Sequence, residues 1–127
     1  MSVKPGMPVT VYEPEGFDPN LRTWGEIVTP DTWRNDNQGA AQDQKVIWTP
    51  RTGRRILLVG VLMSTEVTRW FRWEVDGALL IPPVYLTARG GANLLFMNGL
   101  MLPVDGQLMY TSAGDGWHSV MAYGKEF

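Results

Sequence analysis

The sequence predicts an all-β protein, an antiparallel β-sandwich of the jelly-roll type with about eight short strands and an extended N-terminal arm. Three observations lead to this fold class. Short apolar or alternating segments recur at close spacing, glycine and proline separate them, and the body of the chain contains no convincing amphipathic helix. Many short strands with turn residues between them are typical of an antiparallel sandwich or barrel.

The composition fits one cysteine-free domain. A chain of 127 residues is most naturally a single folding unit. The absence of cysteine excludes a disulfide framework, a thiolate metal site and a thiol nucleophile. The formal net charge of −2 gives no general reason to expect nucleic acid or an anionic membrane surface as a partner. No apolar run approaches the ~20 residues of a membrane span.

Residues 1–44 are predicted to form the extended arm. Prolines at positions 5, 8, 14, 19 and 30 interrupt any helix, and only residues 8–12 alternate like a strand. The segment is nevertheless too apolar to be called disordered. We therefore expect Phe17, Trp24 and Trp33 to be buried against a neighbouring subunit, where each contributes on the order of 1.5–3 kcal/mol.

The body is predicted to span residues 45–127, after a polar hinge at residues 35–43. It opens with a short strand at residues 45–49. Residues 54–64 are the most hydrophobic run and carry apolar side chains on both faces, which predicts a central strand covered on both sides. The later strands are expected at residues 68–76, 78–81, 84–87, 93–97, 100–102, 108–112 and 117–123.

The strand at residues 68–76 carries the candidate contact surface of the body. Its strict alternation places Phe71 and Trp73 on one face and Trp70 on the other. Trp70 therefore offers an aromatic face, and Arg69 and Arg72 flank it in the sequence. We expect Trp70, Arg69 and Arg72 to contact another subunit, because large aromatic and arginine side chains supply most of the energy of such contacts.

The residue types that commonly carry catalysis form no recognisable pattern. The single histidine, His118, has Ser119 as its neighbour, and adjacent side chains of a strand face opposite ways. Zinc sites of the usual kinds need several histidine or cysteine ligands. A calcium loop aligned on Gly39 would place the cations Arg34 and Lys45 at its first and last ligand positions. We therefore expect no enzymatic activity, no metal and no cofactor.

Two stretches of the body carry a distinctive succession of residues. Residues 48–61 read W-T-P-x-T-G-R-R-I-x-L-x-G-V, and residues 106–126 read G-Q-L-x-x-T-S-A-G-x-G-x-x-S-V-x-x-Y-G-x-E. These stretches resemble the opening strands and the closing hairpin of small β-sandwich proteins encoded among bacteriophage virion genes. The resemblance covers about residues 45–127, and the arm before Lys45 departs from it.

The resemblance implies a structural role. Proteins of this group are head decoration or cement subunits, neck or tail components, or fibre-attachment pieces. The implied partner is the major capsid protein or another virion subunit, and the implied assembly is a homo-oligomer, with a trimer as the expectation. The implied location is the capsid surface of the virion, after synthesis in the host cytoplasm, without nucleic acid or membrane as a partner.

The six tryptophans leave a second class of function open. Exposed aromatic faces bind sugar rings, so Trp70, together with Trp117, is the candidate platform of a carbohydrate-binding β-sandwich module. Core packing and subunit contacts are the competing explanation for these large side chains.

Overall fold

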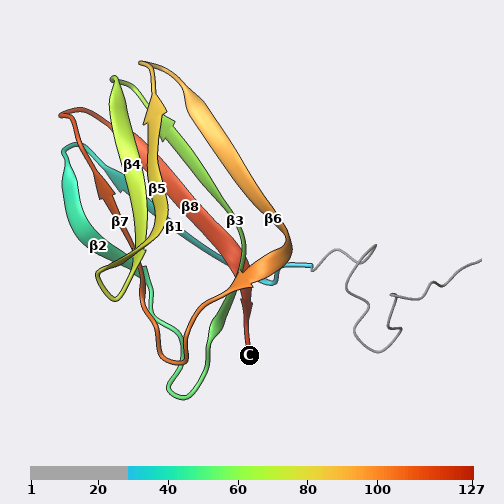
Figure 1. Cartoon of the computed structure of the whole chain (residues 1–127). Helices are drawn as coiled ribbons and strands as arrows, with labels where there is room; N and C mark the ends of the chain where they lie inside the picture. The colour runs from blue at the N-terminus through green and yellow to red at the C-terminus, as the bar shows by residue number, and fades with distance from the viewer. Residues whose placement is uncertain (1–28) are drawn as a thin grey trace, which may run out of the picture.

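The computed structural model describes residues 29–127 and places them in two antiparallel four-stranded sheets (Figure 1). The strands are β1 (Thr32–Gln38), β2 (Gln42–Trp48), β3 (Ile56–Thr65), β4 (Arg69–Val75), β5 (Ala78–Leu86), β6 (Gly91–Met101), β7 (Leu108–Ser112) and β8 (His118–Glu126). This architecture confirms the predicted all-β sandwich. The predicted arm residues Phe17 and Trp24 lie outside the described residues.

The strand order is that of a jelly roll. The order in the first sheet, sheet A, is β1-β8-β3-β6, and the order in the second, sheet B, is β2-β7-β4-β5. The pairs β1–β8, β2–β7, β3–β6 and β4–β5 are all antiparallel, so the chain forms one long ribbon of paired strands wrapped into two layers. Among residues 29–127 there is no helix that is long and apolar enough to cross a membrane.

The core lies between the two sheets and is rich in aromatic side chains. Trp48, Phe71, Trp73 and Tyr110 are almost completely buried there. The indole Nε1 of Trp73 donates to the sulfur of Met63 at 3.3 Å, so a polar atom inside the core has a partner from the opposite sheet. Phe71 and Trp73, which the alternation of β4 places on one face, thus both point into the core.

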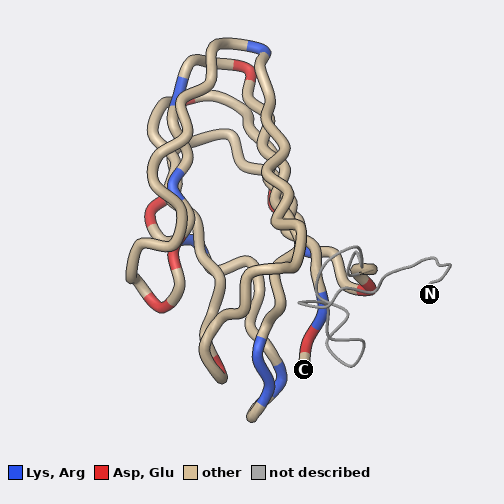
Figure 2. The backbone as a smooth tube through the Cα atoms, turned by 45° about the vertical axis from the view of Figure 1, so that its right-hand side comes forward, with Lys and Arg blue, Asp and Glu red and all other residues tan. Residues whose placement is uncertain are grey.

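β3 is a central strand, as its composition predicts. It pairs with β8 on one side and with β6 on the other, and residues 56–61 are buried. Its pairing register shifts between Leu58 and Gly60. A Cβ at Gly60 would collide with the hydroxyl group of Tyr123, so glycine lets that ring lie across β3. β3 and β6 contain no charged residue, and Figure 2 shows long stretches of sheet A without one.

The boundary predicted between arm and body, at residue 44, falls inside β2. Residues 32–38 form β1 and pair with β8, and residues 42–48 pair with β7, so the predicted hinge at residues 35–43 consists of β1, a turn and the start of β2. Trp33 accordingly lies in the sandwich, opposite Tyr123. The polar sequence of β1 hides this strand, because an edge strand needs backbone partners more than apolar side chains.

Candidate functional site

The outer face of sheet A is organised in rows that run across its four strands. Each row contains one residue from β1, β8, β3 and β6 in hydrogen-bonded register. The three rows are Trp33, Tyr123, Gly60 and Leu95; then Asn35, Met121, Leu62 and Asn93; then Asn37, Ser119, Ser64 and Gly91. The face therefore changes from aromatic and aliphatic at one end to small and polar at the other.

A groove follows the polar end of this face. It consists of two adjoining hollows of about 490 Å³ and about 360 Å³ that share Asn37, Ser64 and Ser119. The larger hollow is bounded by Glu66 and Trp117, among other residues. The smaller one continues between β1, β8 and β3. The row of Asn37, Ser119 and Ser64, called the polar row below, has short side chains, and that is why the surface is hollow there rather than flat.

Trp117 stands at the end of the groove with 59% of its surface exposed. Three indole atoms, Cε2, Cζ2 and Cδ2, lie 3.3, 3.3 and 3.6 Å from the position that a Cβ of Gly39 would take. Nearly equal distances to atoms of both rings place Gly39 against the flat face of the indole. The turn between β1 and β2 therefore supports this exposed ring from one side.

Backbone hydrogen bonds connect the loops around the groove. The amide of Glu66 donates to the carbonyl oxygen of Trp117 at 2.9 Å, and the amide of Thr65 donates to that of Gly90 at 3.0 Å. Arg89 has a φ of 61°, the left-handed region that non-glycine residues seldom adopt. Among residues 29–127, no hydrogen bond or ion pair engages the guanidinium of Arg89 or the carboxylate of Glu66.

A buried polar network lies beneath the groove and joins the two sheets. Nδ1 of His118 lies 2.6 Å from Nη1 of Arg69, and Nε2 of His118 lies 2.9 Å from the hydroxyl of Tyr110. Because a guanidinium only donates, Nδ1 accepts and the proton of the neutral imidazole is on Nε2. Tyr110 then donates its own proton to Asp36 at 2.8 Å. Each step of this chain crosses between sheets.

The network shifts the pKa values of its members. Burial, followed by the charge of Arg69, holds the pKa of His118 below its usual 6.5. Burial and the hydrogen bond to Asp36 raise the pKa of Tyr110 far above its usual value. Both groups are therefore neutral in the folded protein near pH 7, and Arg69 is the charged member of the buried set.

The predicted contact surface on β4 needs a correction. Arg69 is only 3% exposed and faces inward, where it also donates to Thr65 and to the carbonyl oxygen of Gly116. The alternation of the strand separates it from Trp70 and Arg72, which lie together on the outer face of sheet B. The Cζ atom of Arg72 lies 5.4 Å from the centre of the Trp70 ring, and Arg72 pairs with Glu74 at 2.8 Å.

His118 has no geometry for nucleophilic catalysis with a nearby serine. Its Nε2 lies 3.4 Å from the hydroxyl of Ser112, farther than from Tyr110, and both Ser112 and His118 are at most 3% exposed. Within residues 29–127, no three histidine, cysteine, aspartate or glutamate side chains come together to hold a metal ion. The chemistry that this arrangement supports is the rigid connection of two sheets.

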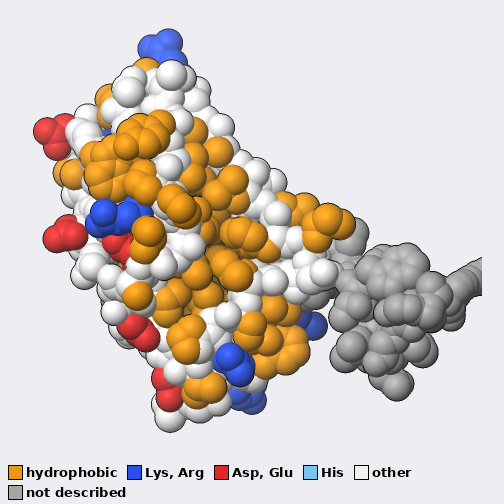
Figure 3. Space-filling model, in the orientation of Figure 1, with side chains coloured by type: hydrophobic (Ala, Val, Ile, Leu, Met, Phe, Trp, Pro, Cys, Tyr) orange, Lys and Arg blue, Asp and Glu red, His pale blue; other side chains and the backbone are white. Residues whose placement is uncertain are grey.

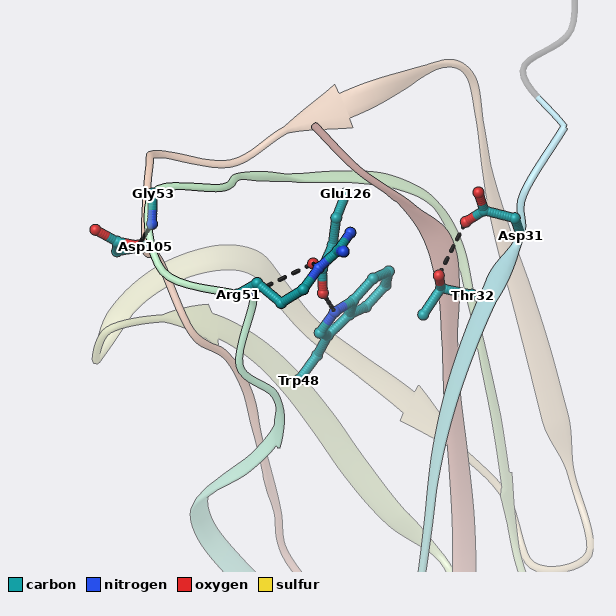
Figure 4. Close-up of polar contacts among 7 residues, drawn as sticks. All are labelled: Asp31, Thr32, Trp48, Arg51, Gly53, Asp105 and Glu126. Carbon is teal, nitrogen blue, oxygen red and sulfur yellow. Dashed lines mark hydrogen bonds and ion pairs between the residues drawn. The ribbon is translucent and has the colours of Figure 1, made fainter.

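Residues 48–51 and the end of β8 meet at the base of the sandwich (Figure 4). The carboxylate of Glu126 accepts hydrogen bonds from Nε1 of Trp48 and from Nε of Arg51, each at 2.9 Å. Burial alone would raise the pKa of Glu126, but these hydrogen bonds outweigh it and lower the pKa to about 2. Nearby, the amide of Gly53 donates to Asp105 at 2.6 Å.

Sequence reasoning named Trp117 but missed its groove. The signal that could have indicated the groove is the run of short polar residues, Asn35, Asn37 and Ser119, in two strands that pair. That signal is readable only when the register of β1 against β8 is known. No protein-family model, curated protein or solved structure matches the chain.

Proposed function

We propose that this protein is a non-enzymatic structural subunit of a bacteriophage virion, bound to the capsid exterior as a decoration or cement protein. Its partner would be the major capsid protein or another virion subunit. Jelly rolls occur in viral capsid proteins but also in lectins and cupins, so the fold alone does not carry this proposal. The observation that supports it best is an edge of sheet A that no other part of residues 29–127 pairs with.

β6 forms that edge. Within the described residues it pairs only with β3, and its eleven residues include neither a charge nor a proline. Leu95, Met97 and Met101 on this strand are 59%, 73% and 45% exposed. Soluble proteins normally protect such strands with charges, prolines or a covering element, because free edges recruit other strands. An uncharged edge of this length therefore suits a subunit that completes its surface by assembly.

The neighbouring edge of sheet B differs in this respect. β5 carries Pro82 and Pro83 in its centre, which interrupt its capacity to accept another strand. Figure 3 shows hydrophobic side chains gathered in a band over β5 and β6, with few charges between them. The exposed side chains of β6 add apolar area to its backbone edge, which has no partner strand among residues 29–127. Backbone pairing combined with apolar burial is a known mode of protein recognition.

A matched pair of variants tests this proposal. Leu95 on β6 and Leu79 on β5 are 59% and 60% exposed, so a lysine at either position changes the surface to the same degree. The full chain is mixed with heads that lack it and is then sedimented. We expect Leu95→Lys to abolish co-sedimentation and Leu79→Lys to retain it. Unchanged binding by Leu95→Lys would remove β6 from the contact, and no binding by the wild-type chain would refute the capsid role.

The oligomeric state is a separate expectation, because the trimer comes from the resemblance alone. Light scattering on the purified chain measures the mass of the assembly directly. If copies associate through β6, we expect Leu95→Lys to reduce the measured mass to that of one chain, 14.3 kDa. A monomeric wild-type chain would exclude self-association in solution and leave the capsid as the partner of β6.

A further inference from the structure

The groove beside Trp117 has the features of a ligand site. We propose that it binds a glycan, with one pyranose ring stacked on the free face of the Trp117 indole. This inference does not rest on the virion role, since no residue of β6 lines the groove. It also moves the sugar platform away from Trp70, whose ring already has the guanidinium of Arg72 above it.

The ring of Trp117 is both accessible and held in place. Its exposed fraction of 59% is high for a tryptophan, and Gly39 supports it on one flat face. This support leaves the indole of Trp117 little freedom to turn away when a ligand approaches. One face of a pyranose ring presents C–H groups, and these pack well on the electron-rich face of an aromatic ring. A supported indole offers such a face without further ordering.

The rest of the groove supplies polar groups for sugar hydroxyls. Asn37 and Ser119 lie side by side on β1 and β8, and the hydroxyl of Ser119 donates to Asn37. The amide group of Asn37 can still donate, and Ser64 adds a further hydroxyl from β3. Each of these side chains can both donate and accept hydrogen bonds. That mixed capacity matches a hydroxyl group, which has the same double character.

Two charged groups in the lining of the larger hollow favour a sugar over other flat ligands. Glu66 and Arg89 provide one acceptor and one donor set, and their charges cancel. A site for single-stranded nucleic acid needs a positive surface along the backbone, which this groove lacks. An apolar protein contact would leave the polar row unsatisfied. A neutral ligand rich in hydroxyl groups fits the balanced charges of the groove and also supplies hydrogen-bond partners to its polar side chains.

The dimensions agree with a short oligosaccharide. The larger hollow, of about 490 Å³, falls within the range of roughly 300–1,000 Å³ that is common for small-molecule sites. The adjoining hollow of about 360 Å³ runs along β8 beside Leu62 and Met121. It gives room for a second ring that is held partly by apolar contact. We therefore expect disaccharides to bind more tightly than the monosaccharide at their end.

A glycan array probed with the full chain, followed by calorimetric titration of the best glycan, tests the proposal. Trp33 is the matched control for Trp117, because it is 54% exposed on the same face of sheet A and does not line the groove. We expect Trp117→Ala to weaken binding about tenfold or more, as loss of aromatic stacking commonly does. Trp33→Ala should bind like the wild type.

A second variant keeps the ring and displaces it. Gly39 does not have a positive φ, so the backbone accepts alanine, but the new Cβ would lie 3.3 Å from two indole atoms. We expect Gly39→Ala to weaken glycan binding while the thermal unfolding temperature stays close to that of the wild type. An array without signal, full binding by Trp117→Ala, or equal losses for Trp117→Ala and Trp33→Ala would each overturn the proposal.

Discussion

The carboxylate of Glu126 and the indole nitrogen of Trp48 are joined by a 2.9 Å hydrogen bond across 78 positions of the chain. Arg51 completes the contact with a salt bridge from its Nε atom (Figure 4). The side chain of Glu126 is only 7% exposed, although Arg51 is largely in solvent. The last residues of β8 are thus fastened to the end of β2, which closes the base of the sandwich.

This contact predicts a loss of stability in acid. The folded protein lowers the pKa of Glu126 from 4.5 to about 2, so its stabilisation is complete above pH 4.5 and disappears between pH 4.5 and about 2. We expect Glu126→Gln to lower the free energy of unfolding at pH 7 by about 1–3 kcal/mol and to flatten its dependence on pH in that window. Urea titrations at several pH values measure both effects.

Glu66→Gln is the control for that experiment, because Glu66 is exposed and has no partner among residues 29–127. Its free energy of unfolding should match the wild type. A Glu126→Gln variant that is as stable as the wild type at pH 7 would contradict the stabilising role of the contact between Glu126, Trp48 and Arg51.

His118 predicts a second pH effect in a separate range. Its folded pKa lies below 6.5, so the unfolded chain binds more protons as the pH falls through 6.5. Stability is therefore greatest above pH 6.5 and decreases as the pH falls from there toward the folded pKa. The chain has one histidine, so thermal unfolding between pH 7.5 and 5 reports mainly on this group. We expect His118→Gln to be less stable at pH 7.5 and nearly independent of pH across this range.

The histidine resonance itself provides a direct check. An NMR titration of the folded chain should show a pKa below 6.5 for the imidazole of His118. A folded His118 that titrates at or above 6.5 would contradict the buried network.

The two arginines at the start and centre of β4 should respond differently to the same change. Arg69 is buried and donates from Nε, Nη1 and Nη2 at once, which a lysine cannot reproduce. We expect Arg69→Lys to lower the free energy of unfolding by about 2–4 kcal/mol, because acceptors in the core lose their donors. Arg72→Lys, on the outer face, should change it by less than about 1 kcal/mol. Equal effects in urea denaturation would argue against an inward Arg69.

Two glycines provide a test of the β3–β8 pairing. A Cβ at Gly124 would collide with the backbone carbonyl oxygen of Leu57, whereas a Cβ at Gly53 meets nothing within 4 Å. We expect Gly124→Ala to lower the free energy of unfolding by more than about 3 kcal/mol, because backbone rather than a flexible side chain must move. Gly53→Ala, at a φ of 81°, should lower it by about 1 kcal/mol. If both variants have the same melting temperature, the close approach of Gly124 to the backbone of Leu57 is not present.

Much of the fold follows from local pattern. The alternation of residues 69–75 directs Phe71 and Trp73 inward, and the apolar run of residues 56–61 is buried as a central strand. The same alternation, applied consistently, places Arg69 on the inner face as well. Its expected contact with another subunit rested on its place beside Trp70 in the sequence, whereas its side chain is buried and bonds to Thr65 and His118.

Local sequence patterns are enough to predict the all-β class and the segments that become most of the strands, because glycine, proline and side-chain alternation act over a few residues. Long-range strand pairing is what brings polar residues 32–38 into sheet A, Gly39 against Trp117, and Trp48 to Glu126. Each of these contacts joins a residue before position 49 to one after position 116. Such partners are chosen by the pairing of distant strands, for which short-range pattern contains no information.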